Sequence, residues 1–296
     1  MTEQLPREAG PTPRVLPAPA PGAELGPTGR RRLRHLARIV RERLELALRA
    51  EWPSPERYGF RPRSAARLFW ITSVLRELWF RVEPHGLENL PAGPFLLVAN
   101  HGSHLLAWDG AMIVTVCLLD AEPPRLVHGM ADHRLMKLPV LGRAARRIGA
   151  VDGTPPACRA LLRAGGVVLT FPEGMNALGK RFRDRYRLGR FGSGFARVAL
   201  ETHVPVVPVA VIGAEEESPI VANPSWLARR IGVAAAPLSP TVVFPLPVKY
   251  RIHFGKPLHL LGPATADNAA REALRVRGGL EELLHHGLES RRHLFW

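Results

Sequence analysis

Short apolar runs alternate with helical patterns along the chain from residue 83 onward. The apolar runs predict buried strands over residues 94–100, 125–131, 167–173, 204–214 and 250–260. Between them, apolar residues at helical spacing predict helices over residues 110–119, 138–149, 155–166, 192–203 and 265–290, the last as one helix or a pair. Because strands and helices alternate, the predicted fold class is α/β, with a central and mostly parallel sheet flanked by helices.

Two amphipathic helical patterns precede this region, over residues 31–82. The first has its apolar stripe among many arginines, at Leu33, Leu36, Val40, Leu44 and Leu48, with Ile39 and Leu46 off the stripe. The second follows three prolines, has Ser64 as its expected N-cap, and has its stripe at Leu68, Ile71, Val74, Leu75, Leu78 and Val82. Tryptophan and phenylalanine flanked by arginines suit the headgroup boundary of a bilayer. This basic helical region is therefore predicted to pack on its own domain, to lie on a membrane surface, or to do both with opposite faces.

The first 30 residues are crowded with Pro, Gly and Ala and have no apolar core of a signal peptide. They predict a disordered tail rather than an anchor. Nowhere do 18 apolar residues follow one another without a charge, so no membrane-spanning helix is expected. Residues 83–296 are predicted to form one domain that ends in a helix.

Lys and Arg total 41 against 26 Asp and Glu, which gives a formal net charge of +15. Such an excess favours a polyanionic partner. Aromatic residues do not interleave with the basic ones and no zinc-finger pattern occurs, so an anionic membrane surface or a phosphate-bearing substrate is favoured over nucleic acid. The two cysteines, Cys117 and Cys158, predict neither a disulfide framework nor a thiolate metal site. A cytoplasmic protein, peripheral on the inner face of the cytoplasmic membrane, is expected.

Polar residues directly follow the predicted strand 94–100, in the sequence "NHGSHLLAWD". A histidine held by a carboxylate can act as a general base, because the carboxylate fixes its tautomer and stabilises the imidazolium. Asp109 lies five positions beyond His104 and eight beyond His101. Either histidine can meet it if the loop folds back at the start of the next helix, so the residues alone leave both pairs open.

The strand 167–173 ends in "FPEGMN". Pro172 and Gly174 around Glu173 predict a tight turn whose exposed N–H groups can hold a phosphate or an oxyanion. Glu173 itself would repel phosphate, so it is expected to accept a hydrogen bond from a hydroxyl or to order a basic neighbour. The alternative is an ordinary turn with a surface carboxylate.

The ordered blocks "ANHGSH…D", "VVLTFPEG" and "VPVVPVAVIGAEE" resemble the glycerolipid acyltransferase family, which includes the acylglycerol-phosphate acyltransferases. The resemblance runs from about Leu90 to His259. It implies that the Asn-His motif and the downstream Asp supply the base, that Phe-Pro-Glu-Gly contributes to binding of the acyl acceptor, and that the Val-Pro strand closes the site. The substrate-binding residues implied or considered are Asn100, Gly102, Ser103, Phe171, Pro172, Glu173, Gly174, Lys180, Arg181 and Arg183.

Two features depart from the common family pattern. The spacing of His, four residues and Asp fits His104, whereas the position directly after the strand belongs to His101 and favours it as the base. The longer loop is similar to a branch that acts on neutral glycerides or other alcohols as well as lysophospholipids. Met175-Asn176 stands where many phospholipid-specific members carry Thr-Arg, so a bidentate phosphate clamp is missing. Basic residues of the stretch 180–190 can replace it or form a solvated face; they are Lys180, Arg181, Arg183 and Arg187.

The implied reaction is direct transfer of a fatty acyl group from a thioester of coenzyme A or acyl-carrier protein, as co-substrate, to a hydroxyl of a glycerolipid. The acceptor is a lysophospholipid or a mono- or diacylglycerol, no cofactor or metal is expected, and N–H groups of residues 102–104 are candidate oxyanion donors. Three alternatives compete. One is a serine hydrolase using Ser103, although "FGSGF" has Phe191 in place of the first glycine of a nucleophile elbow. Another is zinc bound by His101, His104 and Asp109. The third is a catalytically inactive lipid- or membrane-binding protein of the same fold.

Overall fold

The computed structural model describes residues 27–51, 59–102, 107–174, 180–224 and 244–291, with the single residues 177, 226, 230, 238, 239 and 241. Within this part of the chain, seven strands form one sheet in the order β1-β7-β6-β2-β5-β3-β4. The strands are β1 (Glu83–His85), β2 (Leu96–Ala99), β3 (Val127–Ala131), β4 (Val151–Asp152), β5 (Val167–Thr170), β6 (Val206–Ile212) and β7 (Arg251–Phe254). Every pairing is parallel except that of β6 with β7. The predicted α/β class with a mostly parallel sheet is confirmed.

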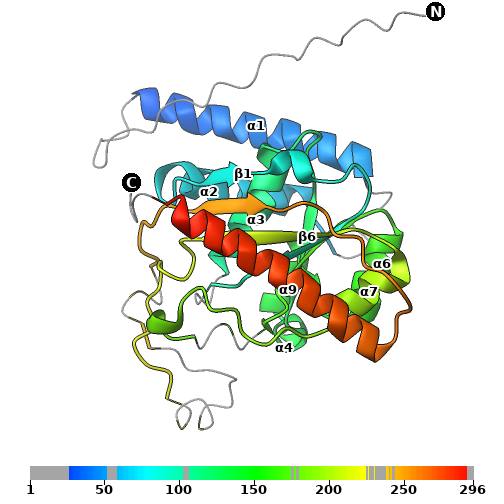
Figure 1. Ribbon diagram of the computed structural model, residues 1–296. Helices are drawn as coiled ribbons and strands as arrows, with labels where there is room; N and C mark the ends of the chain where they lie inside the picture. The colour runs from blue at the N-terminus through cyan, green and yellow to red at the C-terminus, as the bar shows by residue number, and fades with distance from the viewer. Residues whose placement is uncertain are drawn as a thin grey trace, which may run out of the picture.

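Helices cover both faces of the sheet because its central strands are apolar on both sides. The helices are α1 (Pro27–Glu51), α2 (Pro62–Leu78), α3 (Trp108–Leu119), α4 (His133–Lys137), α5 (Leu141–Arg147), α6 (Pro155–Arg163), α7 (Gly194–Thr202) and α9 (Ala266–Glu289). In β2, Leu97 and Ala99 face the core that contains α3, while Leu96 and Val98 face the core built with α6, α7 and α9. Figure 1 shows α9 running across the sheet and α1 lying along one border of the molecule.

The N-terminal helix α1 packs on its own domain through the predicted stripe. Leu36, Val40 and Leu44 are buried, the last two in a cluster with residues of α2 and α3, whereas Leu46, predicted off the stripe, is half exposed. The helix begins at Pro27, so the last residues of the segment 1–30 are helical rather than part of a disordered tail. Residues 1–26 lie outside the described part of the chain.

The second helix, α2, differs from the prediction in its start and in its buried face. It begins at Pro62 with Arg61 as N-cap, so the expectation that Ser64 caps it was wrong. Its buried residues are Ala65, Phe69, Thr72 and Ser73, while Ile71 and Leu78 of the predicted stripe are exposed. Thr72 accepts a hydrogen bond from Thr115 of α3 at 2.7 Å. Small and hydroxyl-bearing residues let α2 approach α3 closely. The face of α2 that carries them is therefore buried in place of the predicted apolar stripe.

Most of the remaining elements follow the predicted order, with bounds that differ by a few residues. The segment 265–290 forms the single helix α9, and Cys117 and Cys158 are both buried and free, as the absence of a disulfide framework predicted. The short strands β1 and β4 and the short helix α4, which precedes the predicted helix 138–149, were not predicted. In the described part of the chain, no helix is both long and apolar enough to cross a membrane.

Candidate active site

His101 and Asp109 meet at the carboxyl edge of the sheet. His101 follows β2 by two positions, and Asp109 lies in the first turn of α3. The distance from His101 Nδ1 to Asp109 Oδ2 is 2.7 Å. The same oxygen accepts the N–H of Gly102 at 2.6 Å, and Oδ1 accepts the N–H of Gly110 at 2.7 Å. Because Nδ1 is engaged by the carboxylate, Nε2 is the ring nitrogen left to exchange a proton.

The imidazole is also fixed by an aromatic neighbour. The ring of His101 stacks on that of Phe171, the residue after β5, with centroids 4.2 Å apart and planes 23° apart. The side chain of His101 remains 12% exposed, whereas that of Asp109 is 2% exposed. The pair therefore combines a buried, anchored carboxylate with a ring that still reaches the surface.

The local electrostatics stabilise the charged form of His101 when it faces an ionised Asp109. Burial of the imidazole opposes its charge, but the Asp109 carboxylate outweighs burial and raises the pKa of His101 above its ordinary value. Burial would raise the pKa of Asp109, yet His101 and the two backbone N–H donors hold that pKa below its ordinary range. The imidazolium that forms when His101 accepts a proton is thus stabilised.

Asn100 does not present its side chain to a substrate in this structure. Its amide donates to the carbonyl oxygen of Val211 at 3.0 Å and accepts from the N–H of Val211 at 2.7 Å. The side chain is fully buried, so both halves of the amide tie the end of β2 to β6. The interpretation of Asn100 as a substrate-binding residue is replaced by a structural one.

Gly102 is needed for close packing and not as a free donor. A Cβ on Gly102 would lie 2.9 Å from the carbonyl oxygen of Ala214, which is too close for any other residue to fit without a shift. Its N–H is already donated to Asp109. The prediction that the N–H of Gly102 stabilises an oxyanion therefore fails in this arrangement. Ser103 and His104 lie outside the described residues.

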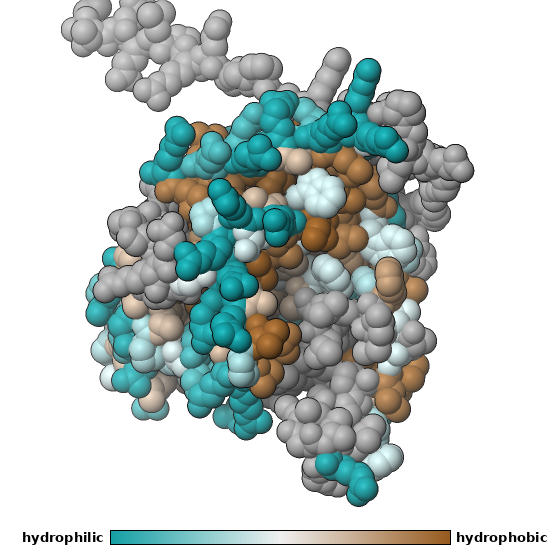
Figure 2. All heavy atoms as spheres, turned by 180° about the vertical axis from the view of Figure 1, so that it is seen from behind, coloured by the Kyte–Doolittle hydropathy of each residue, from teal (hydrophilic) through white to brown (hydrophobic). Residues whose placement is uncertain are grey.

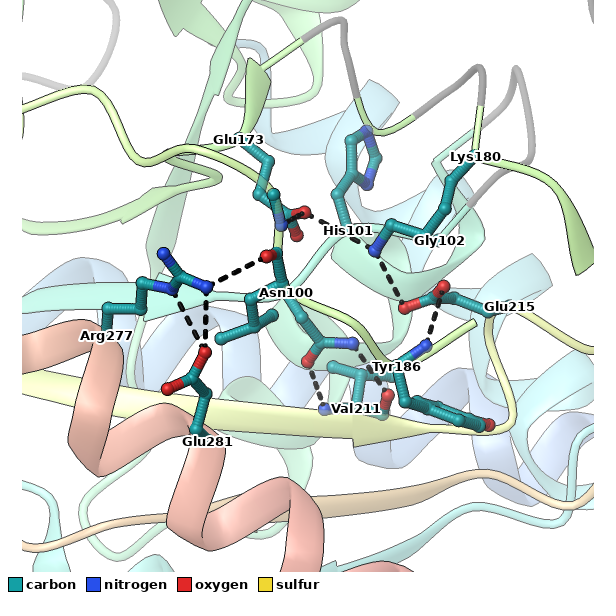
Figure 3. Close-up of polar contacts among 12 residues, drawn as sticks. Asn100, His101, Gly102, Glu173, Lys180, Tyr186, Val211, Glu215, Arg277 and Glu281 are labelled. Atoms are coloured by element: carbon teal, nitrogen blue, oxygen red, sulfur yellow. Dashed lines mark hydrogen bonds and ion pairs between the residues drawn. The ribbon is translucent and has the colours of Figure 1, made fainter. Parts of the chain in front are cut away.

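Lys180 lies between two buried carboxylates. Its Nζ is 3.3 Å from Glu173 Oε2 and 3.3 Å from Glu215 Oε1. Figure 3 shows the three side chains close to His101. Of the two roles predicted for Glu173, this geometry fits ordering of a basic neighbour. Lys180 is neutralised by two carboxylates, so it is not the free phosphate-binding cation that was considered.

The Phe-Pro-Glu-Gly segment forms the predicted tight turn, but its N–H groups are partly engaged. The N–H of Gly174, which has a φ of +59°, donates to the carbonyl oxygen of Phe171 at 3.0 Å. The carbonyl oxygen of Pro172 accepts the N–H of Gly192 at 2.9 Å. Glu173 Oε2 accepts the N–H of Gly189 at 2.7 Å, and its Oε1 is buried with no hydrogen-bond partner among the described residues. That oxygen is the acceptor this turn leaves available.

The arginines of the basic stretch 180–190 lie at the surface. Arg181 is exposed. The side chains of Arg183 and Arg187 are 70% and 81% exposed, 3.7 Å and 3.8 Å from Asp184. None of their described contacts involves His101 or Glu173, so the solvated basic face is the arrangement observed. Met175 and Asn176 lie outside the described residues.

Two buried glutamates near the site were missed in the sequence. Glu215 and Glu217 follow β6, and both are almost fully buried. Burial raises the pKa of Glu215 to about 7, against the opposing charge of Lys180. Glu217 accepts a hydrogen bond from the hydroxyl of Tyr250. The available signal was "AEEES" directly after an apolar strand, because glutamates at the carboxyl end of a parallel strand lie where such sheets place ligand sites.

The alternative chemistries find no additional support in the described part of the chain. Ser193 of "FGSGF" follows irregular backbone and precedes α7, so it is not on a strand-to-helix elbow. No group of three His, Cys, Asp or Glu residues there has an arrangement that could hold a metal ion. His104 is not among those residues.

The fold and the anchored histidine–aspartate pair describe an α/β protein with the residue types of a general-base site. A family model described as Acyltransferase matches residues 81–212. An uncharacterized protein of Mycobacterium tuberculosis (strain ATCC 25618 / H37Rv) is 37% identical over an alignment of 266 positions that covers 82% of this chain and 72% of that protein. The chain therefore belongs to the acyltransferase family, in agreement with the acyltransferase motifs found in the sequence.

Two further similarities were found. A protein of Gallus gallus named "DGAT1/2-independent enzyme synthesizing storage lipids" is 26% identical over 183 residues, 61% of this chain and 53% of its own length. The crystal structure of the 1-acyl-sn-glycerophosphate acyltransferase PlsC from Thermotoga maritima matches with a TM-score of 0.49 and 17% identity, over 88% of this chain and 99% of that one.

Proposed function

We propose that this protein transfers a fatty acyl group from an acyl thioester to a hydroxyl of a glycerolipid, with His101 as general base and Asp109 as its orienting carboxylate. The donor is an acyl thioester of coenzyme A or of acyl-carrier protein, and the acceptor is a lysophospholipid or a mono- or diacylglycerol. The observation that carries this proposal is the 2.7 Å contact between His101 Nδ1 and an Asp109 carboxylate held by two further N–H donors.

In this mechanism, His101 Nε2 takes the proton of the acceptor hydroxyl as the oxygen attacks the thioester carbonyl. The new C–O bond forms a tetrahedral oxyanion, whose collapse breaks the C–S bond and releases the thiol, which recovers the proton from the imidazolium. Asp109 stays ionised throughout and stabilises that imidazolium. No side-chain nucleophile is acylated.

The charges around the site bear on whether the acceptor carries a phosphate. Lys180 is shared by Glu173 and Glu215, so a phosphate-bearing acceptor would have to use the exposed arginines of residues 181–190. A neutral glyceride needs no such cation. In a monoacylglycerol, the hydroxyl that is not acylated can donate to Oε1 of Glu173, which has no hydrogen-bond partner among the described residues. The Gallus gallus relative, named for storage lipid synthesis, is consistent with this acceptor.

The test is an acceptor panel. Purified protein is given an acyl-coenzyme A with lysophosphatidic acid, monoacylglycerol or diacylglycerol, and release of the free thiol is followed together with the acylated product. Release with at least one acceptor is expected. If no acceptor and no chain length gives release while vesicle binding persists, the protein is the inactive lipid-binding alternative.

His101→Ala is expected to lower kcat by about three orders of magnitude or more, because it removes the base. His285→Ala is the matched control: His285 Nε2 also contacts a carboxylate, Glu289 at 3.1 Å, but on the exposed side of α9. The control should keep full activity. If His104→Ala abolishes turnover and His101→Ala does not, His104 is the base instead.

We further propose that the protein works as a peripheral protein on the inner face of the cytoplasmic membrane. The net charge of +15 suits anionic lipid, and Ile71 and Leu78 of α2 are exposed beside the packed helix α1. In Figure 2, hydrophilic side chains line the border where α1 lies in Figure 1, and hydrophobic surface lies directly beneath them. If α2 carries this contact, the affinity for vesicles will fall when Ile71 and Leu78 are replaced by serine.

A further inference from the structure

The turn between α4 and α5 carries four apolar side chains on the surface of the molecule. Leu135, Leu138, Val140 and Leu141 are 39%, 47%, 72% and 54% exposed. Single exposed apolar residues are ordinary in soluble proteins, whereas four within one short turn form a patch that water disfavours. Residues 135–141 are called the apolar turn below.

The apolar turn is held outward by contacts on its inner side. Met136 is its one buried residue, and its carbonyl oxygen accepts a hydrogen bond from Arg146 at 2.9 Å. A Cβ on Gly142 would lie 2.2 Å from that same oxygen, so the backbone is closely packed there. His133 Nδ1 lies 2.8 Å from Asp152 and ties the start of α4 to β4. The exposure of the apolar side chains is therefore built into the fold.

The apolar turn lies at the same edge of the sheet as His101. Helix α4 begins two residues after β3, and β3 pairs in parallel with β5, whose end leads to Phe171 against the His101 ring. Val221 and Phe244, which belong to the segment that joins β6 to β7, are 70% and 75% exposed. They follow β6 and precede β7, whose residue Arg251 pairs with Ile212 at the end of β6.

The charge around the apolar turn fits an anionic partner. From residue 133 to residue 151 the chain has no Asp or Glu but has five basic residues, Arg134, Lys137, Arg143, Arg146 and Arg147. Three of them, Arg134, Lys137 and Arg143, are exposed beside the apolar side chains. A second copy of this face would bring like charges together, whereas an anionic bilayer offers hydrocarbon and phosphate at once.

We propose that the apolar turn inserts into the interface of an anionic bilayer, with Arg134, Lys137 and Arg143 at the level of the lipid phosphates. This contact is separate from the one proposed for α2 and needs neither donor nor acceptor. It turns the edge of the sheet that carries His101 toward the membrane.

The first test compares two double variants in sedimentation with vesicles of phosphatidylglycerol and phosphatidylcholine, without substrate. V140S/L141S should bind roughly tenfold or more weakly, because two aliphatic side chains no longer leave water. L261S/L274S is the matched control, since Leu261 and Leu274 are 66% and 64% exposed away from the turn. It should bind like the unchanged protein. Thermal unfolding of both variants establishes that they fold.

The second test reports insertion directly. Because Cys117 and Cys158 are both buried, a single introduced cysteine can be labelled selectively with a polarity-sensitive dye. A dye at V140C should shift to the blue on anionic vesicles and not on vesicles of phosphatidylcholine alone, while a dye at L274C should not shift on either.

Two results would overturn the proposal. One is equal vesicle binding by V140S/L141S and the unchanged protein. The other is a dimer of the unchanged protein that V140S/L141S disperses, with the dye at position 140 shifted in the absence of vesicles. The second result would assign the apolar turn to contact with another copy of the chain. Both outcomes are independent of whether acyl transfer is observed.

Discussion

Three charged groups that would each be costly to bury alone meet beside His101. Lys180 bridges Glu173 and Glu215, the N–H of Gly189 donates to Glu173 Oε2, and the N–H of Tyr186 donates to Glu215 Oε2. Removing one member of a buried charge cluster leaves its partners uncompensated. At the scale of the residue, Lys180 thus positions Glu173, whose free oxygen belongs to the site.

Lys180→Met is expected to destabilise the protein by about 3 kcal/mol, because two buried carboxylates lose their counter-charge. Urea unfolding measures the loss. The exposed Lys256 provides the control, since Lys256→Met should leave the unfolding midpoint unchanged. K180M/E215Q should recover part of the loss by removing one of the stranded charges. An unchanged midpoint for Lys180→Met would show that the cluster does not depend on the cation.

At the scale of the element, two glycines of helix α9 lie in different surroundings. A Cβ on Gly287 would lie 2.2 Å from Cδ1 of Ile212 in β6, whereas a Cβ on Gly278 meets no atom within 4 Å. Glycine is thus required for close approach at Gly287, near the C-terminal end of α9, whereas at Gly278, midway along α9, it only weakens the helix.

Gly278→Ala is therefore expected to stabilise the protein by about 1 kcal/mol, the difference in helix propensity. Gly287→Ala in the same helix should destabilise it instead, because the methyl group must displace the side chains of Ile212 and His253. Thermal unfolding of the two variants separates the effects. Equal shifts in Tm for both would contradict this account of the packing between α9 and β6.

Most elements could be predicted from periodicity because their buried positions are apolar. The short strands β1 and β4 have three and two residues, which is too few for any period to emerge. The buried face of α2 was misassigned because Thr72 and Ser73 are hydroxyl residues whose hydrogen bonds allow burial, which hydrophobicity alone does not register.

Site contacts between residues close in the sequence could be predicted, whereas those between residues far apart in the sequence could not. His101 and Asp109 lie eight positions apart, and their contact follows from the strand-loop-helix order. The second partner of Lys180 is Glu215, 35 positions away, so no local pattern links them. Asn100 is engaged by a strand 111 positions away, which is why a residue that looked substrate-facing is structural.

At the scale of the whole molecule, two buried histidines make the stability of the fold depend on pH. Burial lowers the pKa of His128 to about 4, and His128 Nδ1 lies 2.9 Å from the carbonyl oxygen of Gly149. Burial also lowers the pKa of His253 to about 4. Both groups bind protons more readily in the unfolded chain, where the ordinary value is 6.5. The stability that they contribute is fully present above pH 6.5 and is lost as the pH falls toward 4.

The free energy of unfolding is thus expected to fall between pH 6.5 and pH 4, with His128 contributing on the order of 3 kcal/mol. His128→Asn, which can still donate to Gly149, should show a smaller fall over this window in urea titrations. The exposed His259 supplies the control, because His259→Asn should keep the full pH dependence. A fall of the same size in His128→Asn would assign the acid sensitivity to other groups.

The two hydrogen bonds between Asn100 and Val211 restrict substitution at position 100 more than at position 211. Asn100 contributes its side chain, but position 211 contributes only its peptide group, which every residue except proline presents in full. Position 211 can therefore exchange among apolar residues that fit the core, whereas position 100 admits only a side chain that donates and accepts at once in that small space.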